Sequence, residues 1–201
     1  MQSLLAASQQ GQLGGDVALV VSNRPAAGGL DSARDASIDT ALIDHQLYPE
    51  RAQFDRELGA VVGSVQPDLV VLAGFMRILT PHFVDAFKGR LVNIHPSLLP
   101  LYPGLHTHQR AIDHGDAYGG ATVHYVTGEL DGGPAIIQAR VPIEPNDTAD
   151  TLAARVLMTE HQIYPMAVSW HLNGRLTLEG ETVSLDGTAL PKTGYAWAES
   201  A

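Results

Sequence analysis

Short apolar runs alternate with longer segments of helical periodicity along most of the chain. Residues 16–22 (DVALVVS) and 68–73 (DLVVLA) are rich in β-branched side chains, as buried strands are. Between them, residues 49–65 repeat apolar side chains from Phe54 to Val65 at helical spacing. Strands and helices that alternate through short loops predict an open α/β fold: a mostly parallel, twisted sheet with helices on both faces.

The other elements follow the same alternation. We expect helices over residues 29–35, 81–87, 106–115 and 147–172, and strands over 38–43, 90–94, 121–127 and 135–143. A hairpin-like piece over 174–189 has Asp186-Gly187 as its turn. The sequence therefore predicts a single domain over residues 1–201, in which residues 174–201 form a C-terminal hairpin and tail.

Composition removes several classes of function. The 201 residues contain no cysteine, which excludes disulfides, thiol catalysis and cysteine-based zinc sites. The formal net charge is −10 and only two lysines occur, so we expect no nucleic-acid partner. No apolar run approaches the ~20 residues of a membrane helix, and the N-terminus lacks a signal-peptide pattern. A cytoplasmic protein without a membrane partner is expected.

Ligands of open α/β folds bind where strands end, and one such loop carries reactive side chains. Asn93 and His95 lie two residues apart at the end of a predicted strand, so they face the same side. An amide and an imidazole placed this way can stabilise an oxyanion and move a proton. The alternative is structural: Asn93 satisfies a loop backbone and His95 is an ordinary buried histidine.

Two further features have competing interpretations. Asp131 lies in the segment ELDGGP, which is first of all a turn, and a catalytic role would require its carboxylate to reach His95 or a bound water. His106 and His108 are candidate metal ligands, but residues two apart on a helix are a poor ligand pair and the chain has no cysteine to add a ligand. We expect no metal.

Several motifs taken together resemble the phosphoribosylglycinamide formyltransferase family. They are AGFMRIL at 73–79, NIHPSLLP at 93–100, YPGLH at 102–106, TVHYV at 122–126 and LDGG at 130–133. The match runs in this order through nearly the whole chain. The resemblance implies a Rossmann-like formyltransferase fold. It also implies transfer of a formyl group from 10-formyltetrahydrofolate to the amino group of glycinamide ribonucleotide, in purine biosynthesis.

The resemblance also implies roles for individual residues. Asn93 would hydrogen-bond the formyl oxygen as it becomes an oxyanion, and protonated His95 would stabilise the same charge. Asp131 would orient His95, favour its protonated form and accept protons from the attacking amine. Glu160 would contact the ribose-phosphate substrate. The residues expected to bind the folate are Arg51, Gly74, Phe75, Met76, Arg77, Ile78, Leu79 and Asn93. The partners would be two small molecules, the folate as co-substrate, and the protein a monomer or weak homodimer.

The N-terminus departs from the family pattern. The family opens with a hydrophobic strand and a glycine-containing loop, which holds the substrate phosphate at a helix N-terminus. Residues 1–5 (MQSLL) instead resemble the helix that follows this loop. Loss of a central strand would expose the edges of its two neighbours. We therefore expect the natural product to start upstream, with the strand and loop restored.

Three other functions stay open. Methionyl-tRNA formyltransferase shares the N-x-H and SLLP signature but normally adds a tRNA-binding domain, and this chain is too short and too acidic for it. Formyltetrahydrofolate deformylase normally carries an extra N-terminal domain. A non-enzymatic, folate-binding remnant would bind folate analogues without turnover.

Overall fold

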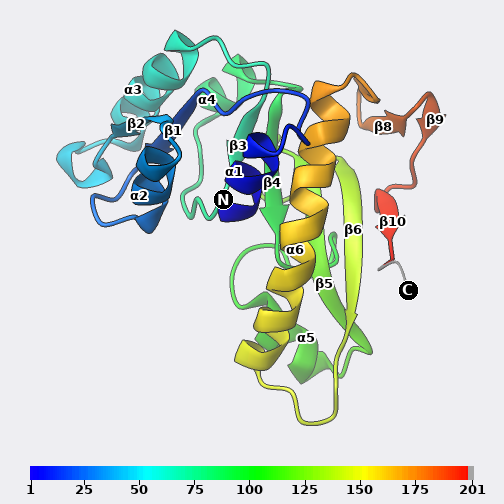
Figure 1. The fold of residues 1–201 in the computed structure, drawn as a ribbon. Helices are drawn as coiled ribbons and strands as arrows, with labels where there is room; N and C mark the ends of the chain where they lie inside the picture. The colour runs from blue at the N-terminus through cyan, green and yellow to red at the C-terminus, as the bar shows by residue number, and fades with distance from the viewer. Residues whose placement is uncertain (199–201) are drawn as a thin grey trace.

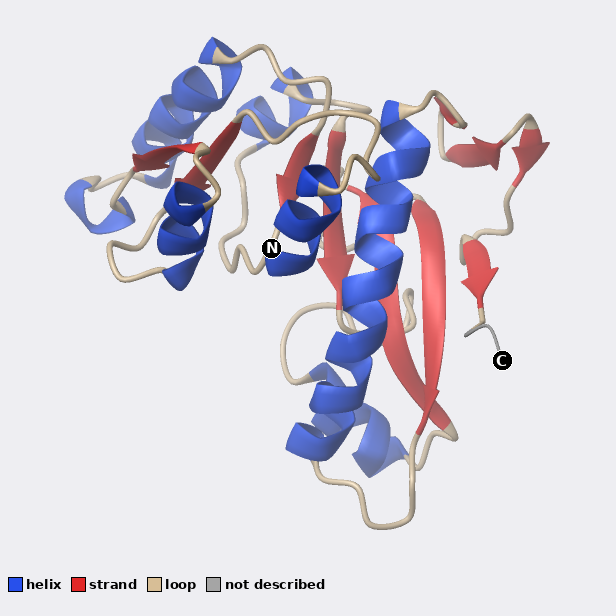
Figure 2. Cartoon of the chain, viewed as in Figure 1, coloured by secondary structure: helices blue, strands red, loops and turns tan. Residues whose placement is uncertain are grey.

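The computed structural model describes residues 1–198 and forms an α/β fold (Figures 1 and 2). The helices are α1 (Gln2–Gln9), α2 (Gly28–Asp35), the 3-10 helix η1 (His45–Leu47), α3 (Arg51–Ser64), α4 (Pro81–Ala86), α5 (Thr107–His114) and α6 (Ala149–Leu172). The strands are β1 (Leu19–Ser22), β2 (Asp39–Leu42), β3 (Val70–Leu72), β4 (Leu91–His95), β5 (Tyr118–Tyr125), β6 (Ala135–Pro142), β7 (Leu176–Glu179), β8 (Thr182–Leu185), β9 (Thr188–Ala189) and β10 (Tyr195–Trp197). None of these helices is long and apolar enough to span a membrane.

The principal sheet has the strand order β10-β6-β5-β4-β3. β3 is parallel to β4 and β10 is parallel to β6, whereas β5 runs antiparallel to both of its neighbours. β5 can reverse direction because only a loop joins it to β6, and an antiparallel pair needs no crossover helix. β1 and β2 form a separate parallel pair. The α/β class predicted from the sequence is confirmed, with β5 as its antiparallel exception.

Helices cover both faces of the principal sheet and create two apolar cores. On one face, α6 packs across β5 and β6 and buries Val123, Ile137 and Val156 completely (Figure 2). The second core gathers Phe54 of α3 and Phe83 of α4, together with buried side chains of neighbouring elements. The two cores hold β4 rigidly between them, which matters because β4 carries the candidate site.

The long helix α6 is capped and tied to the sheet. Thr148 caps its N-terminus through a capping box with Thr151. Further along, the buried Tyr164 hydroxyl donates hydrogen bonds to the carbonyl oxygens of Leu72 (2.7 Å) and Val92 (3.2 Å). One side chain of α6 therefore joins the backbones of β3 and β4.

The C-terminal piece, described here to residue 198, is more elaborate than one hairpin. β7, β8 and β9 form an antiparallel meander whose first turn is at Gly180-Glu181 and whose second turn is at Asp186-Gly187. Asp186 and Gly187 both have positive φ angles (50° and 77°), as a type I′ turn requires. β10 then adds a parallel edge strand to β6, which the sequence analysis did not predict.

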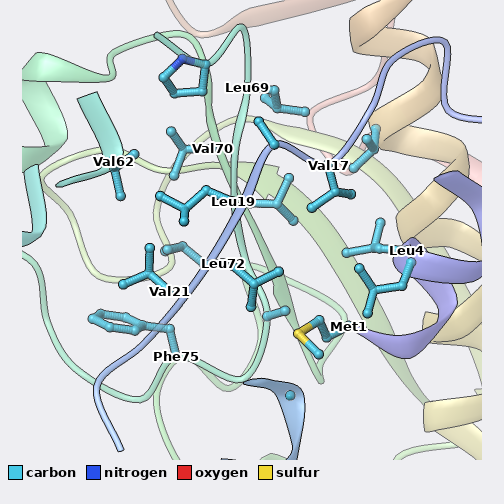
Figure 3. Close-up of a pocket in the computed structure, with 18 of the residues that line it drawn as sticks. Met1, Leu4, Val17, Leu19, Val21, Val62, Leu69, Val70, Leu72 and Phe75 are labelled. Carbon is cyan, nitrogen blue, oxygen red and sulfur yellow. The ribbon is translucent and has the colours of Figure 1, made fainter. Parts of the chain in front are cut away.

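The sequence also predicted that the run over residues 68–73 would be covered on both faces, and this is wrong. Only Val70–Leu72 form β3, and all three side chains are half-buried. The reason is a cavity of about 1250 Å³ that separates β3 from β1 (Figure 3). The cavity lies between the principal sheet and the β1–β2 pair.

Candidate active site

Asn93 and His95 lie on β4 and face the same side of the sheet, as the spacing predicted. The antiparallel pairing of β4 with β5 sets Asn93 opposite His124 and His95 opposite Thr122. β4 ends at His95, and the loop from Pro96 leads away to α5. The two side chains therefore lie at the carboxyl end of a central strand, where α/β folds place their ligands.

His95 is buried and both of its ring nitrogens face acceptors. Nε2 lies 2.9 Å from the carbonyl oxygen of Tyr102, and Nδ1 lies 3.4 Å from Oδ2 of Asp131. A carbonyl and a carboxylate can only accept, so either ring nitrogen has a partner to which it can donate when it carries a hydrogen.

Asp131 occupies a tight turn and also reaches across to the β4 loop. Its φ angle is 51°, in the left-handed region that Asp and Asn tolerate better than most side chains. Besides facing His95, its Oδ2 accepts a 2.9 Å hydrogen bond from the N–H of Gly104, and the side chain is 11% exposed. The turn interpretation and the contact with His95, which the sequence left as alternatives, are therefore both true.

His124 completes the cluster and was given no role by the sequence analysis. Its Nδ1 donates to the carbonyl oxygen of Tyr125 at 2.9 Å, so its Nε2 is free to accept from Asn93 Nδ2, 3.4 Å away. Burial lowers the pKa of His124, against the smaller opposing effects of the Tyr125 carbonyl and the Asp131 carboxylate. The neutral ring therefore orients the amide of Asn93. A histidine inside the apolar run of residues 121–126 was the signal that could have revealed it.

Buried polar side chains anchor the loop that follows β4. Thr122 Oγ1 donates to the Ser97 carbonyl (2.7 Å) and accepts from the Leu99 N–H (3.1 Å). Gln138 Nε2 donates to both the Leu99 carbonyl and Thr122 Oγ1, each at 3.0 Å. β5 and β6 thus fix the start of the loop whose later part supplies the Tyr102 carbonyl to His95.

The later part of this loop holds strained backbone. Tyr102 and His106 have φ angles of 54° and 57°, which side chains of their size rarely adopt, and Gly104 between them has 80°. Strain of this kind costs about 1–3 kcal/mol per residue and gathers at functional sites. Here it positions the Tyr102 carbonyl and the Gly104 N–H against His95 and Asp131.

The segment expected to wrap a folate follows β3 directly. Gly74 turns the chain with a φ angle of 68°, and Gly74 to Arg77 line the edge of the large cavity. Met76 and Ile78 are exposed (71% and 59%), so they are available to an apolar ligand. The Arg77 guanidinium lies over the ring of Phe54, 5.1 Å from its centre. Leu79 packs partly buried against the core formed by α3 and α4.

Two predicted ligand contacts lie apart from this cluster. Arg51 is exposed at the first residue of α3, and within residues 1–198 it has no ion-pair partner. Glu160 is partly buried on α6; burial raises the pKa of its carboxyl, and the nearby amino terminus opposes this. Among the same residues, no group of three or more His, Asp or Glu side chains is arranged to hold a metal ion.

Comparisons with known proteins place the chain among formyltransferases. Residues 1–168 match the formyl transferase family. The chain is 48% identical to phosphoribosylglycinamide formyltransferase of Escherichia coli and 44% identical to that of Haemophilus influenzae, each over 98% of this chain and 92% of the relative. The solved phosphoribosylglycinamide formyltransferase of Coxiella burnetii, in complex with CHES, superposes with a TM-score of 0.93 at 47% identity. That alignment also covers 98% of this chain and 92% of the other.

Proposed function

Because the chain belongs to the formyl transferase family, we propose that it transfers a formyl group from 10-formyltetrahydrofolate to the amino group of glycinamide ribonucleotide, in purine biosynthesis. The observation that carries the proposal is the cluster of Asn93, His95 and Asp131 at the end of β4, in a chain 48% identical to such an enzyme. The proposal includes a cytoplasmic location, a monomer or weak homodimer, and no metal.

The cluster suits the charge changes of formyl transfer. The amine nitrogen forms a bond to the formyl carbon, negative charge builds on the formyl oxygen, and the bond from that carbon to the folate nitrogen then breaks. Asn93 and the His95 imidazolium would stabilise the oxyanion. The amine must lose a proton and the departing folate nitrogen must gain one, and the Asp131–His95 pair would carry that proton. His124 acts through Asn93 by orienting its amide.

The binding residues follow the same division. The backbone from Gly74 to Leu79 and the exposed Met76 and Ile78 would hold the folate ring, with Arg51 approaching from α3. Glu160 would contact the ribose-phosphate substrate from α6. The folate acts as a co-substrate, so it leaves after each turnover.

A formyl-transfer assay tests the proposal against its rivals. It would use the 201-residue chain and a chain extended upstream of Met1, each with and without glycinamide ribonucleotide. At least one of the two chains should remove the formyl group of the folate only when glycinamide ribonucleotide is present. Formate release without the ribonucleotide would indicate a deformylase. Binding of a folate analogue by both chains with no turnover would indicate a remnant.

A further inference from the structure

Tyr102 is held at both ends, and the two ends contact different elements. Its carbonyl oxygen lies 2.9 Å from Nε2 of His95 on β4, and its hydroxyl donates a 2.7 Å hydrogen bond to Oδ2 of Asp116. Asp116 lies between α5 and β5, outside the cluster of Asn93, His95 and Asp131. One residue of the loop after β4 therefore connects the candidate catalytic histidine with a carboxylate beyond the end of α5.

Tyr102 needs support because its backbone is strained. Its φ angle of 54° lies in the left-handed region, where the Cβ atom crowds the backbone. A return to negative φ would turn the chain at this residue and carry its carbonyl away from His95. Contacts of the side chain must therefore hold the backbone in place.

The hydrogen bond to Asp116 is the most directional of these contacts. The Arg110 guanidinium lies over the Tyr102 ring, 5.0 Å from its centre, and donates a 2.7 Å hydrogen bond to the Pro103 carbonyl. The His114 ring meets the same ring edge-on, with their centres 5.6 Å apart. Stacked and edge-on rings tolerate small displacements, whereas a short hydrogen bond fixes both a distance and an angle. The bond to Asp116 also raises the pKa of the Tyr102 hydroxyl, which therefore stays a donor at neutral pH.

The Tyr102 carbonyl determines which nitrogen of His95 keeps a hydrogen. A carbonyl can only accept, so Nε2 carries the hydrogen in this contact. Nδ1, 3.4 Å from Oδ2 of Asp131, is then the nitrogen that can exchange a proton with the carboxylate. Without the carbonyl, a neutral ring would favour its hydrogen on Nδ1, against the carboxylate, and this nitrogen could no longer accept a proton.

We propose that Asp116 is a positioning residue for formyl transfer: through the Tyr102 hydroxyl it holds the Tyr102 carbonyl on His95 Nε2, and so reserves Nδ1 for proton exchange with Asp131. The inference rests on the proposed function and adds to it a residue that touches no reacting group. The Asp116 backbone N–H donates to the Ala111 carbonyl at 3.1 Å, so a change of its side chain keeps the end of α5 closed.

The test compares Asp116→Ala, Asp116→Asn, Tyr102→Phe and the double variant Asp116→Ala/Tyr102→Phe with the parent. Phenylalanine keeps the ring and loses only the hydroxyl, whereas asparagine keeps an acceptor for it. Asp113→Ala is the matched control, because Asp113 is an exposed carboxylate of α5 whose hydrogen bond is to Gln109. The variants are made in both chains of the formyl-transfer assay, and kcat is measured well below the Tm of each protein.

The kinetic effects should fall on kcat. Asp116→Ala and Tyr102→Phe should each lower kcat by about 10–10²-fold, since misplacement by about 1 Å can cost this much, and KM for either substrate should change little. The double variant should be no slower than the single variants, because all of them remove the same hydrogen bond. Asp116→Asn should recover most of the kcat that Asp116→Ala loses, and Asp113→Ala should match the parent.

NMR of isotope-labelled histidine side chains follows the contact without any turnover. The parent should show an Nε2–H signal of His95, identified by its absence from His95→Gln. Asp116→Ala and Tyr102→Phe should lose this signal, and Asp113→Ala should keep it. A role confined to stability would lower Tm and leave the signal in place.

Other results would overturn the proposal. These are an unchanged kcat in Asp116→Ala, additive losses in the double variant, or an Nε2–H signal of His95 that survives in Asp116→Ala. If neither chain transfers formyl groups, the proposed function fails, and the NMR signal then decides whether Asp116 holds His95. If Asp116→Ala does not fold, the same signal in Tyr102→Phe decides, because that variant keeps the ring in place.

Discussion

Replacing Asp131 by asparagine should separate the charge of this side chain from its structural contacts. Asparagine tolerates the left-handed backbone at this position, and its Oδ1 can still accept the hydrogen bond from Gly104. The oxygen that accepts from Gly104 is also the one that faces His95, so in this orientation the ring faces a neutral amide oxygen and the amide nitrogen lies towards His124. The charge that faces His95 is lost, but the turn and its tether to the β4 loop are kept.

The structure gives different magnitudes for asparagine and alanine at this position. Asparagine exchanges a charged hydrogen bond for a neutral one, which should cost about 1 kcal/mol. Alanine leaves the Gly104 N–H without its acceptor, which should lower the free energy of unfolding by about 1–3 kcal/mol. The left-handed backbone at this position adds strain of about 1 kcal/mol for alanine. For a chain of this length, about 2–4 kcal/mol corresponds to a fall in Tm of roughly 4–16 °C. Both variants should lose about 10²–10⁴-fold in kcat, because neither can carry the proton.

The measurements are steady-state formyl transfer and thermal unfolding of the Asp131→Asn and Asp131→Ala variants. The expected pattern is two inactive proteins, of which only the alanine variant is clearly less stable. An asparagine variant with more than a tenth of the original kcat would refute the proposed proton transfer. An asparagine variant as unstable as the alanine variant would mean that the carboxylate is needed mainly for folding.

Three further changes have defined outcomes. Gly133→Ala would direct a Cβ into the Tyr125 carbonyl, so the Asp131 turn must shift. We expect kcat to fall at least about tenfold and the free energy of unfolding to fall by about 1–3 kcal/mol. Gly128→Ala is the control, because nothing lies within 4 Å of the Cβ it adds. Tyr164→Phe removes two hydrogen bonds to β3 and β4, so the free energy of unfolding measured in urea should fall by about 1–3 kcal/mol. Tyr118→Phe is the control, because Tyr118 lies on the surface and its replacement should change this free energy little. Burial lowers the pKa of His108, His124 and His171 below 6.5 in the folded chain. Just below pH 6.5, therefore, only the unfolded chain takes up these protons. The free energy of unfolding should be level above about pH 7 and should fall on acidification by up to about 1.4 kcal/mol per pH unit per histidine. A urea midpoint that is unchanged from pH 7.5 to 5.5 would contradict this.

Local sequence patterns predicted the elements well, because apolar runs and caps act over a few residues. The shared face of Asn93 and His95 is of this kind. The contact of Asp131 with His95 was not predictable, because β5 ends beside the start of β4 and the loop that follows must turn back to bring Asp131 to His95. The role of His124 depends on the same pairing register.

Elements held only by distant contacts also escaped the sequence analysis. β10 is three residues long and has no pattern of its own; it forms because β6 offers an edge and because Tyr195 packs edge-on against Trp170. The half-exposed state of β3 could not follow from its apolar composition either, since burial depends on which neighbour is present.

The left-handed residues of the loop after β4 also bear on how this protein could be engineered. Asparagine or glycine would occupy the backbone of Tyr102 and His106 with less strain, so a thermostabilisation screen should favour such replacements at these positions. The same loop supplies the Tyr102 carbonyl to His95 and the Gly104 N–H to Asp131. Variants that gain melting temperature here are therefore expected to lose turnover, so this loop is where a trade-off between durability and speed should appear first.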